Sequence, residues 1–322
     1  MYIVTGGAGF IGSAVIWEMN QAGIDDILVV DHLGHSDKWK NLVNRLYLDY
    51  IHKDEFLDKL CQGGFDDIQA IIHLGACSST TETDADYLME NNFHYSKSLA
   101  QYALLRDIRF INASSAATYG DGTAGFSDDV ERLAQLLPLN MYGYSKHLFD
   151  LWAYRTDALS RLVSLKFFNV FGPNEYHKED MCSVVYKAFG QVGQTGRLRL
   201  FKSYLPEYAD GGQMRDFVYV KDCARLIVWL LEHPGVNGLF NVGTGRARTW
   251  NDLAAAVFAA MGKSLDIEYI DMPDTLRDRY QYYTEAKMDK LDSVGCPVTM
   301  TPLEEAVDDY INGYLTQADP YL

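Results

Sequence analysis

TGGAGFIG, at residues 5–12, is the stretch that decides the fold of this chain. It follows the apolar run Met1–Val4 and precedes an amphipathic stretch that predicts a helix over 13–21. Its glycines recur at every third position, as Gly6, Gly9 and Gly12. Glycines at this spacing allow a tight turn, the approach of a pyrophosphate and close packing of a helix on a strand. Because a helix N-terminus holds phosphates through its unpaired N–H groups, the motif predicts a dinucleotide-binding turn.

A second apolar run ends in an acid that bears on the choice of cofactor. Asp31 closes the run 27–31 and stands where a carboxylate reaches the adenosine ribose of a dinucleotide. A carboxylate there favours NAD, because it repels a 2′-phosphate. The loop that follows carries four basic side chains, His32, His35, Lys38 and Lys40. One lysine folded back would neutralise that phosphate, although Lys38 is equally well explained as a solvated surface cation. The spacing therefore predicts an NAD(P) site and leaves NAD and NADP open.

Apolar runs and helical stretches alternate through the first half of the chain. The apolar runs lie at 27–31, 68–74, 108–113 and 161–167, and the helical stretches lie near 86–105 and 141–156. This alternation predicts an α/β fold, a Rossmann-type doubly wound parallel sheet. After Gly172 and Pro173 short strands and helices mix, and the regular alternation ends.

This change of pattern divides the expected fold into two parts. We expect residues 1–167 to form an NADP-binding Rossmann domain, to which residues 216–246 return. We expect residues 168–215 and 247–322 to form a smaller, mixed α/β substrate-binding lobe. The expected boundary is therefore discontinuous in the sequence.

The composition argues against several classes of protein. The 322 residues are 48% hydrophobic, enough for a large core, and carry a net charge of −16 with a pI near 4.8. The chain has no basic stripe for nucleic acid, and no apolar run approaches the ~18 residues of a membrane span. Its five cysteines form no CxxC pair or ligand-like cluster, so we expect them to be reduced and mostly buried, with no metal bound. No charged leader precedes the first strand, and we expect a cytoplasmic protein.

The pentad YGYSK at 142–146 carries a second group of functional residues. Tyr142 and Lys146 are four positions apart among helix formers, so their side chains share one helix face. A lysine ammonium beside a phenol favours the phenolate and lowers a tyrosine pKa from its usual value of about 10. Tyr142 would then remove a proton from a substrate hydroxyl while hydride leaves the same carbon for a nicotinamide. Alone, the pentad fits a core tyrosine and a solvated lysine; together with the glycine motif it predicts hydride chemistry.

Two serines follow the strand predicted at 108–113. Ser114 and Ser115, within NASSAATY at 112–119, would stand at the carboxyl end of a central strand, where sheets of this kind bind ligands. A hydroxyl there would hydrogen-bond the reacting oxygen and share its proton with Tyr142. Paired serines after a strand are also ordinary turn residues.

These motifs resemble those of the extended short-chain dehydrogenase/reductases that act on nucleotide sugars, and most closely the ADP-heptose epimerases among them. Several motifs are shared by all extended members. GACSSTTE at 75–82, the HK pair before Met181 and the RYQ triplet at 279–281 are more particular to the heptose epimerases. The similarity runs nearly end to end, through VTGGAGFIGS at 4–13, DILVVD at 26–31, GACSSTTETD at 75–84, NASSAATYGDGT at 112–123, MYGYSKHLFD at 141–150, FFNVFGPNEYHK at 167–178, MRDFVYVKD at 214–222, GLFNVGTGRARTW at 238–250 and RYQYYTEA at 279–286.

The resemblance implies a set of cofactor-binding residues. Phe10 and Ile11 would back the pyrophosphate beside Gly6, Gly9 and Gly12. Asp31, His32, Lys38 and Lys53 would lie at or near the adenosine end. The nicotinamide half would be lined by Leu74, Gly75, Ala76, Cys77, Ser78, Asn91, Lys146 and Val170. Members of this family keep NADP tightly bound and commonly assemble into homo-oligomers.

The resemblance also implies the catalytic and substrate-binding residues. Ser115 and Tyr142 would be catalytic, with Lys146 tuning Tyr142. Lys178 would be a second acid/base on the opposite side of the sugar, since proton and hydride return to the other face of the same carbon. Without the resemblance, Lys178 in the charged segment PNEYHKED fits a solvated cation. The substrate would be held by Ser78, Asn169, Asp180, Lys187, Phe201, Lys202, Ser203, Tyr204, Arg215 and Tyr280.

The implied activity is interconversion of the D-glycero and L-glycero forms of an ADP-manno-heptose by transient oxidation at C6, a step of lipopolysaccharide core biosynthesis. A UDP-hexose 4-epimerase would use Tyr142 similarly and would not need Lys178. A sugar 4,6-dehydratase would place acids where Ala116 and Ala117 follow Ser115. A non-catalytic NADP-binding sensor or scaffold would usually lack a member of the Tyr–Lys pair. The chain departs from the family at Leu74, Glu179, Asp180 and Lys187, so we expect pocket details to differ.

Overall fold

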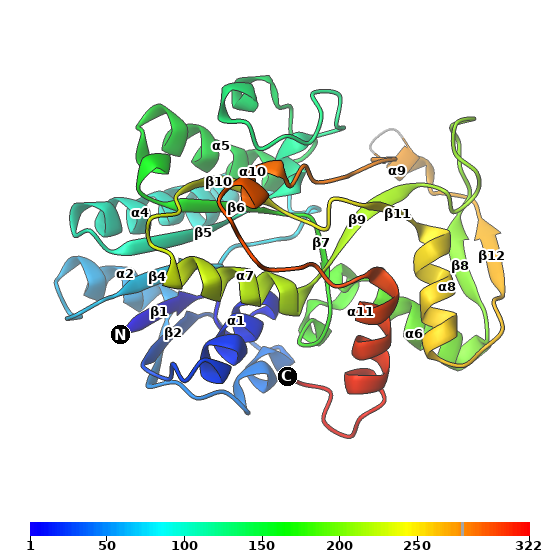
Figure 1. Cartoon of the computed structure of the whole chain (residues 1–322), viewed down its shortest axis with the longest axis horizontal. Coiled ribbons are helices and arrows are strands. Elements are labelled where there is room, and N and C mark those ends of the chain that lie inside the picture. The colour runs from blue at the N-terminus through cyan, green and yellow to red at the C-terminus, as the bar shows by residue number, and fades with distance from the viewer. Residues whose placement is uncertain (278–279) are drawn as a thin grey trace.

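The computed structural model describes residues 1–277 and 280–322, and its largest element is a seven-stranded sheet (Figure 1). All its strands are parallel, in the order β10-β6-β5-β4-β1-β2-β3. The strands are β1 (Tyr2–Thr5), β2 (Ile27–Asp31), β3 (Asp49–His52), β4 (Ala70–His73), β5 (Arg109–Ser115), β6 (Val163–Phe167) and β10 (Gly238–Val242). The chain runs from β1 outward to β3 and then returns to the other side of β1 as β4. The prediction of a doubly wound parallel sheet is confirmed, and this reversal beside β1 is where such sheets bind ligands.

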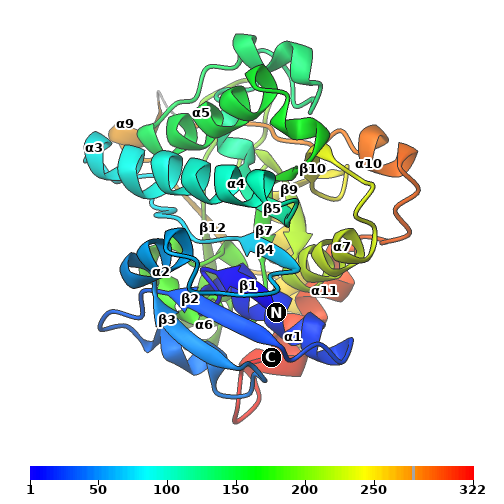
Figure 2. The same ribbon diagram turned by 90° about the vertical axis from the view of Figure 1, so that its left-hand side faces the viewer.

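Apolar side chains alternate along the strands and make two buried cores, one on each face of the sheet. Val4 of β1 belongs to the core under α1 and α7, and its neighbour Ile3 belongs to the core under α2, α4 and α5. Figure 2, turned by 90°, shows α4 and α5 together on the side away from α1. These helices are α1 (Phe10–Gln21), α2 (Lys53–Cys61), α4 (Tyr95–Leu105), α5 (Met141–Arg155) and α7 (Val220–Glu232). Burial of apolar surface on both faces is the main favourable contribution to folding.

The turn between β1 and α1 requires glycine at two positions. Gly6 has a φ of +68°, and a Cβ there would lie 2.6 Å from the nitrogen of Gly75 in the loop after β4. At Gly12, in the first turn of α1, a Cβ would overlap the carbonyl oxygen of Gly6. The turn is closed by hydrogen bonds from Gly6 N to Val30 O (2.7 Å) and from Gly9 N to Gly6 O (2.9 Å). It therefore brings the N-terminus of α1 to the carboxyl edge of the sheet.

The later half of the chain forms a smaller α/β part, on the right of Figure 1. It contains a three-stranded sheet in the order β11-β9-β7 and a two-stranded sheet of β12 and β8. Its strands are β7 (Asn169–Phe171), β8 (Leu198–Phe201), β9 (Met214–Tyr219), β11 (Ala247–Thr249) and β12 (Ile267–Ile270), and its longer helices are α6 (Val184–Thr195), α8 (Trp250–Ala260) and α11 (Leu303–Tyr310). The short helices of the chain are α3 (Ala85–Leu88), α9 (Asp274–Arg277) and α10 (Asp289–Ser293).

Residues 216–246 are divided between the two parts. β10 lies in the large sheet and α7 packs against α1, whereas β9 pairs with β7 and β11. The division into a nucleotide-binding domain and a substrate-binding lobe stays a prediction.

Several local features differ from the sequence predictions or lie outside them. The apolar pattern predicts neither β3 nor α2. β3 is a four-residue edge strand in which only Ile51 is buried, so no apolar run marks it. The helix predicted over 86–105 is interrupted by a π-helical turn at Met89–His94. The expectation of mostly buried cysteines is wrong: all five are free, and only Cys182 and Cys223 are buried. Arg279 of the RYQ triplet lies outside the described residues. Within the described ranges no helix is long and apolar enough to cross a membrane.

His73, at the end of β4, is fully buried and makes stability depend on pH. Its Nδ1 lies 2.6 Å from Thr5 Oγ1 and its Nε2 lies 2.7 Å from Ser96 Oγ. Ser96 donates its own proton to the carbonyl oxygen of Asn92. The donating nitrogen of His73 is therefore Nε2, and Nδ1 accepts from Thr5. Burial, together with the nearby charge of Lys146, lowers the pKa of His73 from 6.5 to about 3.

We predict that His73→Asn flattens the acid side of the stability profile. The unfolded chain binds a proton at His73 below pH 6.5, whereas the folded chain binds it only near pH 3. The free energy of unfolding therefore falls as the pH drops through this window. In urea unfolding between pH 6.5 and about pH 4.5, the variant's slope should be smaller by about 1.4 kcal/mol per pH unit. Replacing the exposed His94 by Asn is the matched control, and an unchanged slope in His73→Asn would contradict the assignment.

Candidate active site

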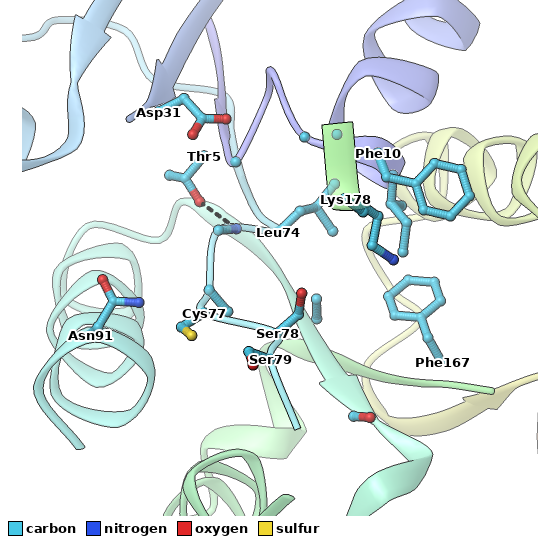
Figure 3. Close-up of a pocket in the computed structure, with 18 of the residues that line it drawn as sticks. Thr5, Phe10, Asp31, Leu74, Cys77, Ser78, Ser79, Asn91, Phe167 and Lys178 are labelled. Atoms are coloured by element: carbon cyan, nitrogen blue, oxygen red, sulfur yellow. Dashed lines mark hydrogen bonds between the residues drawn. The ribbon is translucent and has the colours of Figure 1, made fainter. Parts of the chain in front are cut away.

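A cleft of about 570 Å³ lies beside β1, where the strand order reverses (Figure 3). Its volume suits a small ligand or a cofactor. Its walls come from the turn before α1, the loop after β4, the end of β5 and the first turns of α5. Every residue predicted to bind the cofactor lines this cleft, and so do the predicted catalytic residues Ser115, Tyr142, Lys146 and Lys178. The cleft therefore collects residues from distant parts of the chain.

The phosphate end of the cleft is the N-terminus of α1. Its N-cap is Gly9, which has no side chain to cap the helix, and no acidic residue lies in the first turn. The positive end of the helix is thus left to a ligand. Gly6, Gly9 and Gly12 all line the cleft and leave it free of side chains at this point. These residues fit the pyrophosphate of a dinucleotide.

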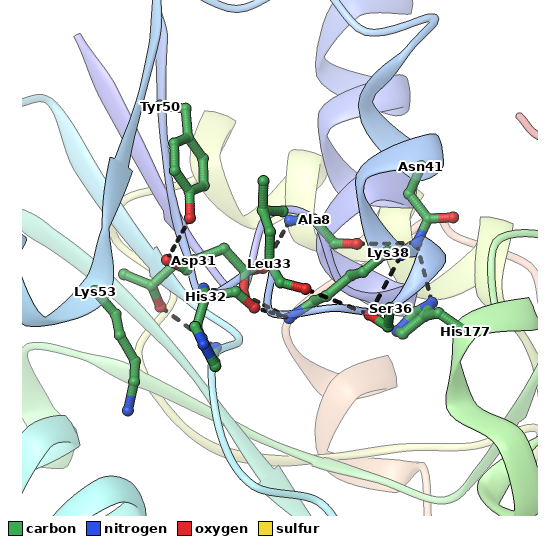
Figure 4. Close-up of polar contacts among 12 residues, drawn as sticks. Ala8, Asp31, His32, Leu33, Ser36, Lys38, Asn41, Tyr50, Lys53 and His177 are labelled. Atoms are coloured by element: carbon green, nitrogen blue, oxygen red, sulfur yellow. Dashed lines mark hydrogen bonds and ion pairs between the residues drawn. The ribbon is translucent and has the colours of Figure 1, made fainter.

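At the adenosine end, Asp31 is buried and its carboxylate is fully engaged (Figure 4). Oδ2 accepts from the backbone nitrogen of Ala8 at 2.8 Å. Oδ1 accepts from the nitrogen of His32 at 2.6 Å and from Lys38 Nζ at 2.5 Å. Lys38 is therefore folded back onto Asp31 instead of extending into solvent. Nearby, Lys53 Nζ donates to Asn91 Oδ1 at 2.6 Å.

Tyr142 and Ser115 meet in the cleft from two elements. Asn140 caps α5 by accepting from the nitrogen of Gly143 at 2.8 Å, which places Tyr142 in the first turn. A Cβ at Gly143 would lie 2.7 Å from the carbonyl oxygen of Ala117, so glycine allows α5 to approach the loop after β5. Ser115 ends β5, and both Ser115 and Tyr142 line the cleft. Burial raises the pKa of Tyr142, and hydrogen bonding by Ser115 opposes the rise.

Lys146 lies one turn further along α5 and is buried. Its Nζ donates to the carbonyl oxygen of Ala113 at 2.8 Å. Burial lowers its pKa to about 8, and the charge of Asp150 opposes the change. Lys146 is therefore charged below about pH 8. Because its hydrogen bond goes to the backbone of β5, its effect on the pKa of Tyr142 stays a prediction.

Lys178 reaches the cleft from the later half of the chain. It lies in η6, a 3-10 segment at Tyr176–Met181, and its Nζ is 5.1 Å from the centre of the Phe10 ring. Burial lowers its pKa, and the charge of Glu175 opposes the change. The next residue, Glu179, has a φ of 48°, a conformation that side chains other than glycine rarely adopt. The structure thus places a half-buried amine in the cleft, where the sequence alone fits a solvated cation.

A second cavity, of about 270 Å³, adjoins the cleft. Lys178 and Met181 line both, so Lys178 lies between the two spaces. Asn169, which the resemblance implies as a substrate ligand, lines the second cavity together with Phe217 and Trp250. The arrangement leaves room for a ligand beside the cofactor cleft.

Arg215 is buried among aromatic rings next to this cavity. Its guanidinium lies 5.7 Å from the centre of the Trp250 ring and 5.2 Å from that of Tyr280, and Trp250 Nε1 donates to Tyr280 OH at 2.9 Å. Arg215 Nη1 donates to the carbonyl oxygen of Met214 at 2.8 Å. Within residues 1–277 and 280–322 no carboxylate pairs with it. Two of the predicted substrate ligands, Arg215 and Tyr280, are therefore brought together.

Apart from Ser78 and Asn169, the predicted substrate ligands line neither cavity. Lys187 Nζ donates to the carbonyl oxygen of Asp180 at 2.5 Å, and both residues are exposed. In residues 201–204, which begin at the last residue of β8, Lys202 and Tyr204 both contact Asp271, at 3.2 and 3.1 Å. Their contact with substrate stays a prediction.

The cleft also contains residues that the sequence does not single out. His177 is the clearest example, because it lies beside Lys178 and burial lowers its pKa to about 4. A histidine in a charged loop carries no periodic signal, and only its place in the HK pair marks it. The others are Thr5, Val30, Ser79, Tyr87, Tyr95, Ala113, Phe167, Phe168 and Met181.

The fold and this cleft define a dinucleotide-dependent enzyme. The family described as the NAD dependent epimerase/dehydratase family matches residues 2–243, and the chain belongs to it. Among curated relatives, the ADP-L-glycero-D-manno-heptose-6-epimerase of Nitratidesulfovibrio vulgaris strain DP4 is 63% identical over 323 residues, covering all of both chains. The protein of the same name from Fusobacterium nucleatum subsp. nucleatum is 48% identical over 332 residues, also covering all of both.

Solved structures agree with this family. The Helicobacter pylori ADP-L-glycero-D-manno-heptose-6-epimerase superposes with a TM-score of 0.80 at 25% identity, covering 97% of this chain and 95% of that one. A UDP-N-acetylglucosamine 4-epimerase from Methanobrevibacter ruminantium has a TM-score of 0.81 at 24% identity, over 97% and 96% of the chains, and shares the fold.

A buried ion pair joins α5 to β6. Asp150 of α5 and Lys166 of β6 are 2.8 Å apart, and both side chains are fully buried. Asp150 also accepts from Ser114 Oγ at 2.6 Å and from Ser164 Oγ at 2.9 Å. The pair thus joins α5 to β5 and β6.

We predict that Asp150→Asn lowers the free energy of unfolding by roughly 3 to 5 kcal/mol, because it leaves Lys166 charged and unpaired in the core. Adding Lys166→Met removes that charge, so the double variant should be more stable than Asp150→Asn alone. Urea unfolding of the three proteins at one pH measures both effects. A double variant no more stable than the single one would show that the unpaired charge is not the cause.

Proposed function

We propose that this protein is an ADP-L-glycero-D-manno-heptose 6-epimerase, which interconverts ADP-D-glycero- and ADP-L-glycero-β-D-manno-heptose by transient oxidation at C6 with bound NADP. The observation that carries the proposal is that two proton-transferring side chains, Tyr142 and Lys178, line one cleft from different elements. A dehydrogenase or a one-base epimerase needs one such group, whereas an epimerase that serves each face of the carbon with a separate group needs two. Relatives of this name at 46% to 63% identity support the choice of substrate.

In this proposal, the cleft residues would hold a nicotinamide cofactor, which would supply the reversible hydride acceptor for C6. Tyr142 exchanges the proton of the C6 hydroxyl at one face, and the Ser115 hydroxyl holds the phenol oxygen in place. Lys178 exchanges the proton at the opposite face, and because burial lowers its pKa, its neutral form is more accessible than that of a surface lysine. Lys146, charged below about pH 8, stabilises the phenolate of Tyr142.

We assign the substrate diphosphate to Arg215. Its guanidinium lies over the rings of Trp250 and Tyr280, and no carboxylate among the described residues pairs with it, so its charge suits an anionic ligand. A guanidinium fork suits phosphate oxygens. The second cavity between Lys178 and Trp250 would then take the sugar.

We assign NADP rather than NAD to the cleft because of the pair formed by Lys38 and Asp31. Its 2.5 Å separation sets a cation at the position where Asp31 alone would repel a 2′-phosphate. Lys53, which lines the same end of the cleft, adds a second positive charge. A homo-oligomer, a cytoplasmic location and a role in lipopolysaccharide core biosynthesis stay predictions of the resemblance.

We predict that Lys38→Ala weakens NADPH binding by roughly 10- to 100-fold, the range expected for one charge-assisted hydrogen bond. Affinity for NADH, which lacks the 2′-phosphate, should change much less. Fluorescence titration of cofactor-depleted protein with each nucleotide measures both constants. Lys40→Ala is the matched control, since Lys40 pairs with Asp37 at 2.8 Å and does not line the cleft. Equal losses for NADPH and NADH would argue against the assignment.

We predict that Tyr142→Phe and Lys178→Met each slow epimerisation by about 10²- to 10⁴-fold, the usual contribution of one general acid or base. Purified protein is incubated with ADP-D-glycero-β-D-manno-heptose, and the two C6 epimers are separated by anion-exchange chromatography. Tyr144→Phe, on the same helix and exposed, and Lys59→Met, on the surface, are the matched controls.

The outcomes separate the mechanism from the substrate. Unchanged turnover in Lys178→Met would remove the two-base mechanism and favour a 4-epimerase-like reaction. If folded wild-type protein gives no product even with added NADP⁺ or NAD⁺, the heptose assignment falls, and UDP-, GDP- and dTDP-sugars are the next substrates to test.

A further inference from the structure

The segment Asn174–Lys178, which ends in the proposed second acid/base, packs directly on the beginning of α1. Asn174 is fully buried with a φ of +77°, and its Nδ2 donates to Ser13 Oγ at 2.9 Å. At the other end of the segment, Lys178 lies over the ring of Phe10. Ser13 and Phe10 both belong to the first turns of α1. The position of Lys178 is therefore tied to the helix that bounds the phosphate end of the cleft.

One side chain, Asn41, links this segment to the phosphate-binding turn itself (Figure 4). It belongs to η1, the 3-10 segment Asp37–Leu42 that also carries Lys38, and it is only 2% exposed. Its Nδ2 donates to the carbonyl oxygen of Ala8 at 2.9 Å and to that of Asn174 at 3.1 Å. The same nitrogen lies 3.3 Å from Nδ1 of His177. An amide nitrogen has two N–H bonds, so both are used across this junction.

The outer side of the segment is held separately. Tyr176 OH donates to the carbonyl oxygen of Pro320 at 2.6 Å, and the nitrogen of Leu322 donates to Asn174 Oδ1 at 3.0 Å. These contacts keep the segment folded against the end of the chain. Asn41, in contrast, sets how the segment lies relative to Ala8 and therefore relative to the cofactor cleft.

We propose that Asn41 is a positioning residue for Lys178, holding the second acid/base in register with the phosphate-binding turn. The inference rests on the proposed function, because only there does Lys178 exchange a proton with substrate. Asn41 makes no contact with the reacting atoms in this scheme. A displacement of a catalytic group by about 1 Å costs on the order of 10²-fold in rate, so loss of one anchor is enough to be measured.

The two substrate epimers distinguish a positioning role from a general loss of structure. In a two-base mechanism, oxidation of one epimer starts with proton removal by Tyr142 and oxidation of the other starts with Lys178. Each pure epimer is mixed with the NADP⁺ holoenzyme in a stopped-flow instrument, and the absorbance of reduced nicotinamide is followed. We predict that Asn41→Ala slows oxidation of the Lys178-dependent epimer by about 10- to 100-fold. Oxidation of the Tyr142-dependent epimer should change little.

Four further variants define the comparison. Lys178→Met and Tyr142→Phe identify which epimer depends on which base. Asn41→Asp keeps the shape of the side chain but removes both donors, so it should show the same preference as Asn41→Ala without leaving a cavity. Asn44→Ala is the matched control, because Asn44 is exposed and its side chain donates to Asp319 at 2.9 Å.

Hydrogen exchange gives a readout that does not depend on turnover. Backbone amides of residues 174–178 should exchange faster in Asn41→Ala than in wild type, and those of α7 should be unaffected. Equal slowing of both epimers by the Asn41 variants would overturn the inference and leave Asn41 a structural role only. If Lys178→Met and Tyr142→Phe themselves show no preference between epimers, the two-base function fails, and this inference fails with it.

Discussion

The contact between Gly12 and the carbonyl oxygen of Gly6 is the constraint on which the rest of the site depends. Because no Cβ fits between them, α1 begins directly against the turn that follows β1. The same turn is hydrogen-bonded to β2 through the carbonyl oxygen of Val30. On the other side, the nitrogen of Leu74, which follows β4, donates to the carbonyl oxygen of Thr5 at 3.0 Å. β2, β4 and the N-terminus of α1 therefore meet beside the end of β1. Phe10 and Ser13 take their places from this point, and the segment that carries Lys178 takes its place from them.

Local motifs explain why the fold and the cofactor cleft were predictable. Alternating runs indicate the parallel sheet, and the glycine turn and the YGYSK pentad both lie within short stretches whose spacing fixes their geometry. The family assignment rests on the same motifs, and the family match over residues 2–243 confirms it. β3 is too short to show a period, and the π-helical turn before α4 leaves the apolar pattern of the helix intact, so neither was visible.

Contacts between distant segments were not predictable. Asn41 is hydrogen-bonded to Ala8 and Asn174, which lie 33 and 133 positions away in the sequence. No pattern in the sequence around Asn41 indicates either partner. The same holds for Arg215, whose aromatic neighbours come from the start of α8 and from residue 280. Burial decides the properties of such residues, and a single sequence does not give burial in an irregular lobe. Lys178 shows the difference most clearly, since its segment is highly charged and its amine is nevertheless half-buried.

Arg215 has a consequence for the sugar end of the ligand. Its cation lies over the faces of two rings, and we assign it to an anion outside the cleft that Tyr142 and Ser115 line. With the diphosphate anchored there, as proposed, the sugar can rotate about the bonds that join it to the phosphates. Under that proposal, a ketone formed at C6 would turn about these bonds and present its second face without leaving the protein. An anchor remote from C6 would retain the reactive intermediate, and its binding energy would serve retention rather than the chemical step.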